Sequence, residues 1–377
     1  MKRKRPAESA IPWQAVVHFR CIRNGLVGGG FETAVDVCKQ LFGIQAQEVM
    51  PSLISIWNRL ASGAHAASDG RESDVTHEHV KRRDQGLIRI WAQRGTLHVF
   101  HFDDWPLARS CTGDKVIAMY GARIDAMSKT LEQQLLKKSP RTILDKTKDP
   151  DARHIRMVTV TEGRAAWHIG EPHARRLTCR EEIAPGLKWN LPERHDALVD
   201  AATRYFNAYG PATEPDFRYM MGIHAGPSKA AVEHLIRSGI LSTVAVDRDG
   251  QEMELLILSD LVDQIRKLAQ TTKPLGFVRL LYKFDPVLLA HKDKSWLIDG
   301  EHKQHIWAPF AQILPSVVVN GRIRGTWQYK RNTNGDIAFA ITLFDSVKDN
   351  DDIRSAVALQ VAGLAKFLGA SSYTVEY

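Results

Sequence analysis

The strongest constraint on the fold of this chain is an order of elements that occurs twice, three helices followed by a hairpin of two strands. In the first hundred residues, apolar side chains recur at helical spacing in three segments: 13–23, 32–42 and 51–60. Two alternating segments, 87–93 and 96–100, then flank Arg94-Gly95, which is a hairpin turn signal. Three helices and a two-stranded wing are the elements of a winged-helix unit.

The same order returns after residue 195. A helix over 196–208 ends before Gly210-Pro211, Thr213 can cap a second helix, and 228–238 supplies a third. Strands over 240–246 and 253–258 form the second wing. The block between the two units, 111–190, starts with a Lys- and Arg-rich helical segment and has alternating stretches at 155–161 and 165–169. We interpret both stretches as strands and the block as another winged helix.

The pattern of the last hundred residues is that of β-structure. Asn320-Gly321 and Asn334-Gly335 are type I′ turn signals between alternating segments. The predicted strands are 277–284, 316–320, 322–329, 337–344 and 373–377, with a helix over 353–368. The sequence therefore predicts an α+β fold with three tandem winged-helix domains and a small β-rich C-terminal domain. The predicted boundaries are 10–110, 111–194, 195–274 and 275–377.

Two primary amides lie two positions apart in Gln45-Ala46-Gln47. On a helix they would face opposite ways, whereas in an extended stretch residues i and i+2 share a face and can converge on one small molecule. Gly43 and Pro51 bracket the segment and favour the extended form. The alternative is that both glutamines are solvated loop residues, but apolar neighbours tie the segment to a core.

Composition and motifs exclude several classes of protein. No apolar run among the 377 residues is long enough to span a membrane. The four cysteines include no Cys-x-x-Cys pair, which excludes a zinc ribbon and fits reduced thiols in the cytoplasm. Neither a His-Glu-x-x-His motif nor a phosphate-binding loop is present, so we expect no metal and no cofactor. The net charge of +8 favours a polyanionic partner, although many basic chains are simply soluble.

Short motifs stand at 41–47, 94–98, 284–286, 291–293 and 321–327. Together they resemble the AlkZ/YcaQ family of winged-helix DNA glycosylases. In that family the catalytic motif is Gln-aliphatic-Gln in the AlkZ branch and Gln-aliphatic-Asp in the YcaQ branch. Gln45 and Gln47 resemble the AlkZ branch, while Ala46 is smaller than the usual branched residue. The resemblance implies tandem winged helices and release of N7-alkylated purines, including bulky adducts and crosslinks.

The amides suit this chemistry on physical grounds as well. Breaking an N-glycosidic bond requires stabilisation of an oxocarbenium-like sugar and departure of the base. An N7-alkylated guanine is already positively charged, so it leaves without being protonated. Paired side-chain carbonyls can accept both hydrogens of a water molecule and hold it against the anomeric carbon. Glutamine cannot act as a base, so such a site should select cationic lesions.

Other candidate residues carry positive charge or aromatic rings. Arg94 and His98 on the first wing can meet phosphate or the lesion, or be structural. The basic residues of segment 322–331 alternate with Trp327 and Tyr329, a mix that suits nucleic acid but also occurs on solvated strands. The loop 291–294 reads alone as a turn, and the family resemblance adds it to the site. The predicted DNA contacts are Arg94, His98, Lys292, Lys294, Arg322, Arg324, Lys330 and Arg331. The residues expected near the lesion are His291, Asp293 and Trp327.

The sequence thus leads us to expect a monofunctional DNA glycosylase with catalytic residues Gln45 and Gln47. It would act as a cytoplasmic, nucleoid-associated monomer on double-stranded DNA that carries alkylated purines, in DNA repair or in self-resistance to an alkylating agent. Two alternatives stay open. One is a non-catalytic winged-helix DNA-binding protein, such as a regulator or lesion sensor. The other is a scaffold that binds protein through its wings, which would show no salt-dependent affinity for DNA.

Overall fold

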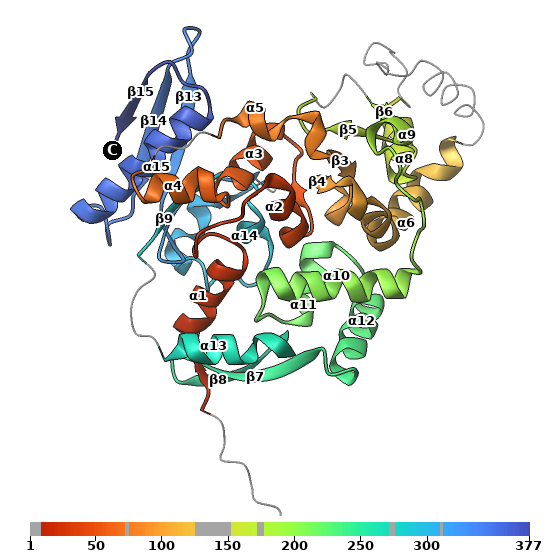
Figure 1. Ribbon diagram of the computed structural model, residues 1–377. Coiled ribbons are helices and arrows are strands. Elements are labelled where there is room, and N and C mark those ends of the chain that lie inside the picture. Colours follow the sequence, from red (N-terminus) through yellow and green to blue (C-terminus); the bar gives the residue numbers. More distant parts are fainter. Residues whose placement is uncertain (1–8, 72–74, 125–151, 172–176, 271–275, 310–311) are drawn as a thin grey trace, which may run out of the picture.

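The computed structural model describes residues 9–71, 75–124, 152–171, 177–270, 276–309 and 312–377. The N-terminal helices, within residues 13–57, lie at the centre, the helices within residues 194–269 lie below them, and the last sheet lies at one side (Figure 1). No described helix has the length and apolar character needed to cross a membrane.

The three predicted N-terminal helices are present. Their bounds are α1 (Trp13–Arg23), α2 (Ala34–Leu41) and α3 (Val49–Trp57). A capping box begins α2, in which the Thr33 hydroxyl accepts from the backbone N–H of Asp36 and the Asp36 carboxylate accepts from the Thr33 backbone N–H. The predicted wing strands are β3 (Leu87–Trp91) and β4 (Leu97–His101), and both are confirmed.

The wing is part of a larger sheet. Its strand order is β2-β4-β3-β5-β6, with β2 (Ile44–Gln45), β5 (Ala165–His168) and β6 (Thr178–Cys179). β5 was predicted, and it pairs with β3, so the block after residue 111 shares a sheet with the first unit. Parts of that block, 125–151 and 172–176, lie outside the described residues.

One predicted strand is wrong. Residues 155–161 belong to a helix, α8 (Ala152–Thr161), in which the Thr161 hydroxyl donates to the carbonyl of Met157 at 2.7 Å. A short apolar run cannot distinguish the strand period from a buried helix, and here the helix packs against α6 (Trp105–Ile124).

The second predicted group of helices and strands is also confirmed. A capping box at Thr213 begins its second helix, as predicted. The N-terminal strand β1 (Ile11–Pro12) adds to this wing in parallel with its first strand. The elements are α10 (Arg194–Tyr209), α11 (Glu214–Met221), α12 (Ala225–Arg237), β7 (Leu241–Arg248), β8 (Gln251–Leu258) and α13 (Val262–Ala269).

The C-terminal part forms the predicted sheet. Its strand order is β15-β14-β13-β12-β9, and α15 (Asp351–Phe367) packs beside β9. Asn320 and Gly321 both have positive φ, at 50° and 83°, which is the type I′ geometry predicted between β12 and β13. The strands are β9 (Val278–Leu281), β12 (Ser316–Val319), β13 (Arg322–Arg331), β14 (Ile337–Leu343) and β15 (Tyr373–Glu376).

Short elements complete the described fold. They are α4 (Ala66–Ser68), α5 (His77–Val80), α9 (Arg180–Ile183), α14 (Pro286–Leu289), β10 (Trp307–Ala308) and β11 (Gln312–Ile313). One apolar core runs from α1 to α15, so the helices and the last sheet are packed together. The number of winged-helix domains and their boundaries stay predictions.

Candidate active site

The chain is extended at Gln45, as predicted, but it leaves the strand and bends at Gln47. After α2, Gly43 turns the chain with φ 94°, and a Cβ at this position would lie 2.4 Å from the ring of Phe100. Only glycine therefore fits the turn. In β2, Gln45 lies opposite His98 of β4, so the two side chains share a face of the sheet.

Both side-chain carbonyls face the turn that joins β3 to β4. Gln45 Oε1 accepts a hydrogen bond from Nη2 of Arg94 at 2.8 Å, and Gln47 Oε1 accepts one from the backbone N–H of Leu97 at 3.3 Å. An amide oxygen has two lone pairs, so each carbonyl keeps one further acceptor position. Gln45 is 9% exposed and Gln47 is half-buried, which places both amides at the edge of the core.

The prediction that His98 contacts DNA has to be corrected. His98 is 2% exposed, and its Nδ1 donates to the carbonyl of Thr96 at 3.0 Å. Burial, with the charge of Arg94 adding to it, lowers the pKa of His98 to about 3. The ring is therefore neutral at neutral pH, and its Nε2 lone pair faces Arg94 at 3.5 Å. It lies beneath the amide site and is not at the surface of the protein.

Arg94 connects the amide site to the second helical group. Its Nη1 donates to the carbonyl of Met220 in the last turn of α11. Arg94 also lines a cleft of about 470 Å³ together with Arg194 and His224. Arg94 thus contacts the amide of Gln45 and is also one of the residues that line this cleft. Sequence reasoning missed the contribution of α11, because the two partners are 126 positions apart and no local pattern relates them.

Two residues of the loop 291–294 are buried, contrary to prediction. His291 packs in the core, where its Nε2 donates to the carbonyl of Tyr209 at 3.0 Å. Lys294 donates to the carbonyl of His291, and its Nζ lies 4.8 Å from the ring centre of Tyr219 and 5.7 Å from that of Trp307. Burial lowers the pKa of Lys294 to about 7. Neither side chain is available for the predicted contact with lesion or phosphate.

The other two residues of this loop are exposed. Asp293 accepts from Nη1 of Arg248 at 3.2 Å, an ion pair that joins the loop to the end of β7. Lys292 donates its backbone N–H to Asp216, which leaves its side chain at the surface. DNA contact by Lys292 stays a prediction, and so does a position of Asp293 near the lesion.

One predicted contact on β13, that of Trp327, needs correction, while DNA contact by the partly exposed Arg322 and Arg324 stays a prediction. Arg322 and Arg324 both donate to the carboxylate of Asp299, at 2.8 Å for Arg324, so their charges are partly neutralised within the protein. Trp327 is buried, and its Nε1 donates to the carbonyl of Leu281 at 2.9 Å. It is a core residue of the last sheet rather than a lesion contact.

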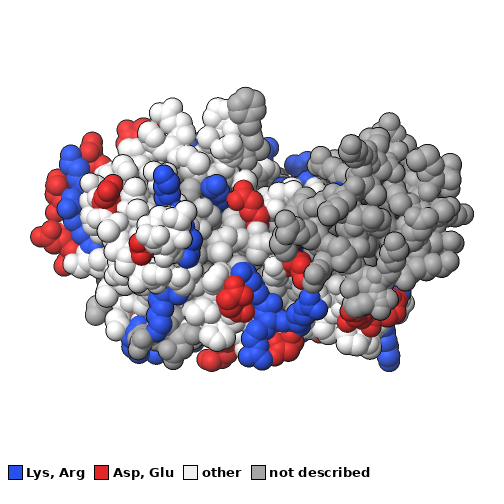
Figure 2. All heavy atoms as spheres, turned by 90° about the horizontal axis from the view of Figure 1, so that it is seen from above, with Lys and Arg blue, Asp and Glu red and all other residues white. Residues whose placement is uncertain are grey.

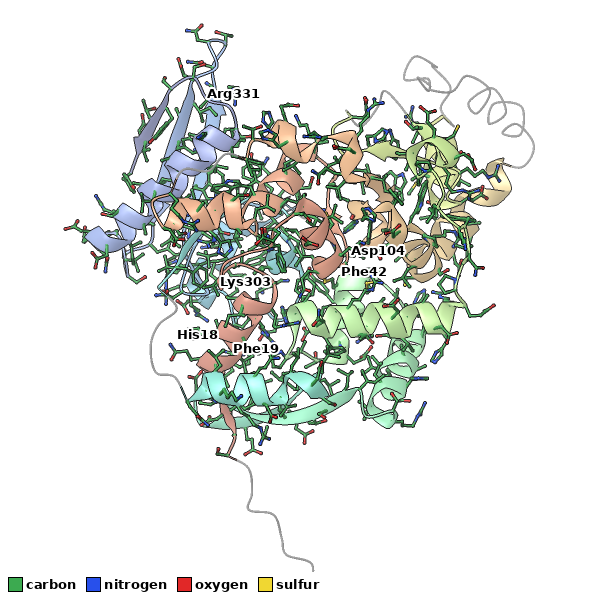
Figure 3. The ribbon with its side chains drawn as sticks, viewed as in Figure 1. His18, Phe19, Phe42, Asp104, Lys303 and Arg331 are labelled. Carbon is green, nitrogen blue, oxygen red and sulfur yellow. The ribbon has the colours of Figure 1, made fainter. Side chains whose placement is uncertain are left out.

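The far end of β13 carries the predicted cations that are exposed, Lys330 and Arg331. Arg331 lies beside the end of α15 (Figure 3), where it donates to the carbonyls of Leu368 and of Gly369. On the face shown in Figure 2, Lys and Arg side chains lie among Asp and Glu side chains rather than in one continuous basic area. DNA contact by Lys330 and Arg331 stays a prediction.

Replacing Lys330 and Arg331 by glutamine should weaken binding to all duplex sequences alike. Each lost phosphate contact lowers the slope of log affinity against log salt by about 0.9, so the double variant should lose about two units of slope. The measurement is affinity for undamaged duplex over a salt series. The matched control is Arg322→Gln with Arg324→Gln, which removes two charges from the same strand but breaks pairs with Asp299 instead. Equal slopes for all three proteins would show that this strand end does not contact DNA.

Comparison with known proteins agrees with the geometry. The family model described as "DNA glycosylase AlkZ-like" matches residues 38–367. The chain is 24% identical over 356 residues to the interstrand DNA cross-link repair glycosylase of Streptomyces sahachiroi, covering 84% of this chain and 87% of that protein. The solved structure of the Streptomyces sahachiroi DNA glycosylase AlkZ superposes with a TM-score of 0.73 at 20% identity, covering 98% of this chain and all of the other. Because the family model spans most of the sequence, this chain belongs to the AlkZ-like family of DNA glycosylases.

Proposed function

We propose that this protein is a monofunctional DNA glycosylase that hydrolyses the N-glycosidic bond of cationic N7-alkylpurines in double-stranded DNA. The observation that supports this most directly is the pair of amide oxygens, on Gln45 and Gln47, held at one end of the β3–β4 hairpin of an AlkZ-like chain. In the proposed complex, Lys292, Lys330 and Arg331 contact phosphates.

The proposed reaction needs a positioned water molecule and little else. The bond between the sugar C1′ and the base nitrogen breaks, and its electron pair neutralises the positive charge of the purine. The second lone pair of each amide oxygen accepts a hydrogen of the water, whose oxygen bonds to C1′. The partial negative charge of the carbonyls faces the developing sugar cation, and the proton lost by the water passes to solvent.

The protonation states beside the amides support selectivity for cationic lesions. His98 is the titratable group opposite Gln45, and its pKa of about 3 keeps it neutral at neutral pH. Neutral histidine with its Nδ1 proton held by Thr96 cannot protonate a leaving base. A base that already carries its charge does not need that proton, whereas a neutral base does.

The surroundings of Lys294 support a monofunctional enzyme. A bifunctional glycosylase attacks C1′ with an amine, and a lowered pKa is what activates a lysine for this role. Lys294 has the lowered pKa, but its Nζ donates to the carbonyl of His291 and is covered by two aromatic rings. We therefore propose water as the nucleophile.

We extend the proposal to crosslinked purines. The curated relative is named an interstrand DNA cross-link repair glycosylase, and its similarity covers most of both chains. A purine that is crosslinked through N7 has the same cationic leaving group as a methylated one, so the same site chemistry applies. The proposed role is DNA repair or self-resistance to a DNA-alkylating agent.

The test compares lesions that differ in charge. We expect abasic sites to form in duplexes that contain 7-methylguanine or an N7 crosslink, and uracil and 8-oxoguanine to give near-background release. Borohydride should trap no covalent adduct between protein and DNA. Efficient release of uracil would reveal an acid or base that this proposal lacks. DNA binding without any abasic product would instead favour a regulator or lesion sensor.

A further inference from the structure

The side chain of Arg94 is held by three acceptors that come from three different segments. Its Nη2 donates to Gln45 Oε1 at 2.8 Å and lies 3.5 Å from His98 Nε2, while its Nη1 donates to the carbonyl of Met220. Because His98 is neutral and its Nδ1 proton is bound by a backbone carbonyl, its Nε2 faces Arg94 as a lone pair. The guanidinium group thus points inward, and these three contacts fix its position.

The backbone of the turn is shaped to place this group. Arg94 has a left-handed backbone, with φ 54°, which turns its side chain back toward β2 and α11. Gly222, with φ 68°, packs against it, and a Cβ on Gly222 would lie 2.8 Å from Cα of Arg94. A larger residue at Gly222 would push the turn away from α11, so the contact between Arg94 and Met220 requires glycine there.

The guanidinium also selects one orientation of the Gln45 amide. Arginine can only donate hydrogen bonds, so the amide atom that faces Nη2 has to be the oxygen. Without this partner, the terminal torsion of glutamine is broad and roughly two-fold, and the NH₂ group could face the same point equally well. An amide turned in that way would present donors where the proposed reaction needs an acceptor.

We propose that Arg94 is a positioning residue for Gln45 and not a contact to DNA phosphate. This inference rests on the proposed function and deepens it. The wing turn and the C-terminal turn of α11 together set the direction of the amide oxygen, so the water site is assembled from two helical groups that are far apart in the sequence. The sequence alone predicted that Arg94 contacts a phosphate or the lesion, and a phosphate contact would change the affinity for DNA.

The test separates the rate of excision from the affinity for DNA. Arg94→Met keeps the length of the side chain and removes its donors. We expect its single-turnover excision of 7-methylguanine to fall by about 10²-fold, with unchanged affinity for undamaged duplex and an unchanged salt slope. A phosphate contact would instead lower the affinity and reduce the slope by about one. Arg82→Met, which removes an exposed arginine outside the site, is the matched control.

A double variant tests whether Arg94 acts through Gln45. If it does, Arg94→Met combined with Gln45→Ala should excise no more slowly than Gln45→Ala alone. Losses that multiply would overturn the proposal, and so would a wild-type rate in Arg94→Met. Arg94→Lys is the second variant should Arg94→Met fold poorly, because it keeps the charge but not the fork of donors. We expect it to bind DNA with wild-type affinity and to excise at a rate between those of the wild type and Gln45→Ala. Absence of abasic sites with the wild-type protein would refute the proposed function itself. A lowered affinity and salt slope of Arg94→Met would refute the proposal for Arg94, because they would show a phosphate contact.

Discussion

Replacing Gln45 or Gln47 by alanine is expected to lower the single-turnover rate of 7-methylguanine excision by about 10²-fold in each case. Each carbonyl has one lone pair bound to the β3–β4 turn and one available for water, so each variant removes one of the two acceptors that hold the nucleophile. The double variant should be the slowest, because no acceptor is left. DNA affinity should change little, since neither amide is charged.

The control for these variants is Gln328→Ala, which removes an exposed glutamine from β13. Thermal unfolding of all variants shows whether a lower rate reflects loss of fold. Wild-type rates in both single variants would remove the amide pair from the mechanism. Gln45→Ala also leaves the half-buried Arg94 with one acceptor fewer, so we expect it to be less stable than the wild type by about 1–3 kcal/mol.

Gln47→Asp replaces the amide of this site by a carboxylate, which is a stronger acceptor. A carboxylate accepts the hydrogens of water more strongly than an amide, and it stabilises the sugar cation better. The backbone N–H of Leu97, which now donates to Gln47, can donate to the carboxylate instead. We expect this variant to keep its activity on 7-methylguanine, in contrast to Gln47→Ala. Its loss of activity would indicate that the amide NH₂ group, and not the carbonyl, is needed.

Replacing Asp285 by alanine is expected to lower the free energy of unfolding by about 3–5 kcal/mol. Asp285 and Arg59 are both fully buried, and two hydrogen bonds of 2.8 Å join the carboxylate to the guanidinium. The variant leaves an uncompensated charge in the core. It also removes the acceptor for the backbone N–H of Val287, which begins α14. Urea unfolding, with the midpoint and slope compared to wild type, measures the loss.

Two further variants show that burial causes this effect. The exposed pair between Lys39 and Asp103 has a single contact of 3.3 Å, and Asp103→Ala should cost less than about 1 kcal/mol because water screens the charges. Arg59→Met combined with Asp285→Ala should lose less stability than the sum of the two single changes, since no charge is then left unpaired in the core. An equal loss for Asp103→Ala and Asp285→Ala would contradict this account.

The sequence by itself determined the elements whose signals are local. Apolar spacing located α1, α10 and the strands of both wings, and the pattern at Thr213 located the start of α11. Gly43 and Pro51 were enough to predict that the chain is extended at Gln45, but not that it bends at Gln47. These features depend on neighbours within a few positions, so they can be predicted from the sequence without knowledge of the tertiary structure. The short run at 155–161 failed because such a run fits either period until its packing partners are known.

The tertiary structure alone decided which charged side chains are available to a partner. Nothing in the local sequence distinguishes the cations Lys294 and Arg324 from the exposed Lys330. In the structure, Lys294 is buried under aromatic rings and Arg324 is paired with Asp299. The partner of Arg94 at Met220 is equally invisible along the chain. Burial and pairing are set by groups that folding brings together from distant positions, and they alter the pKa, direction and reach of a side chain without leaving any trace in its local sequence.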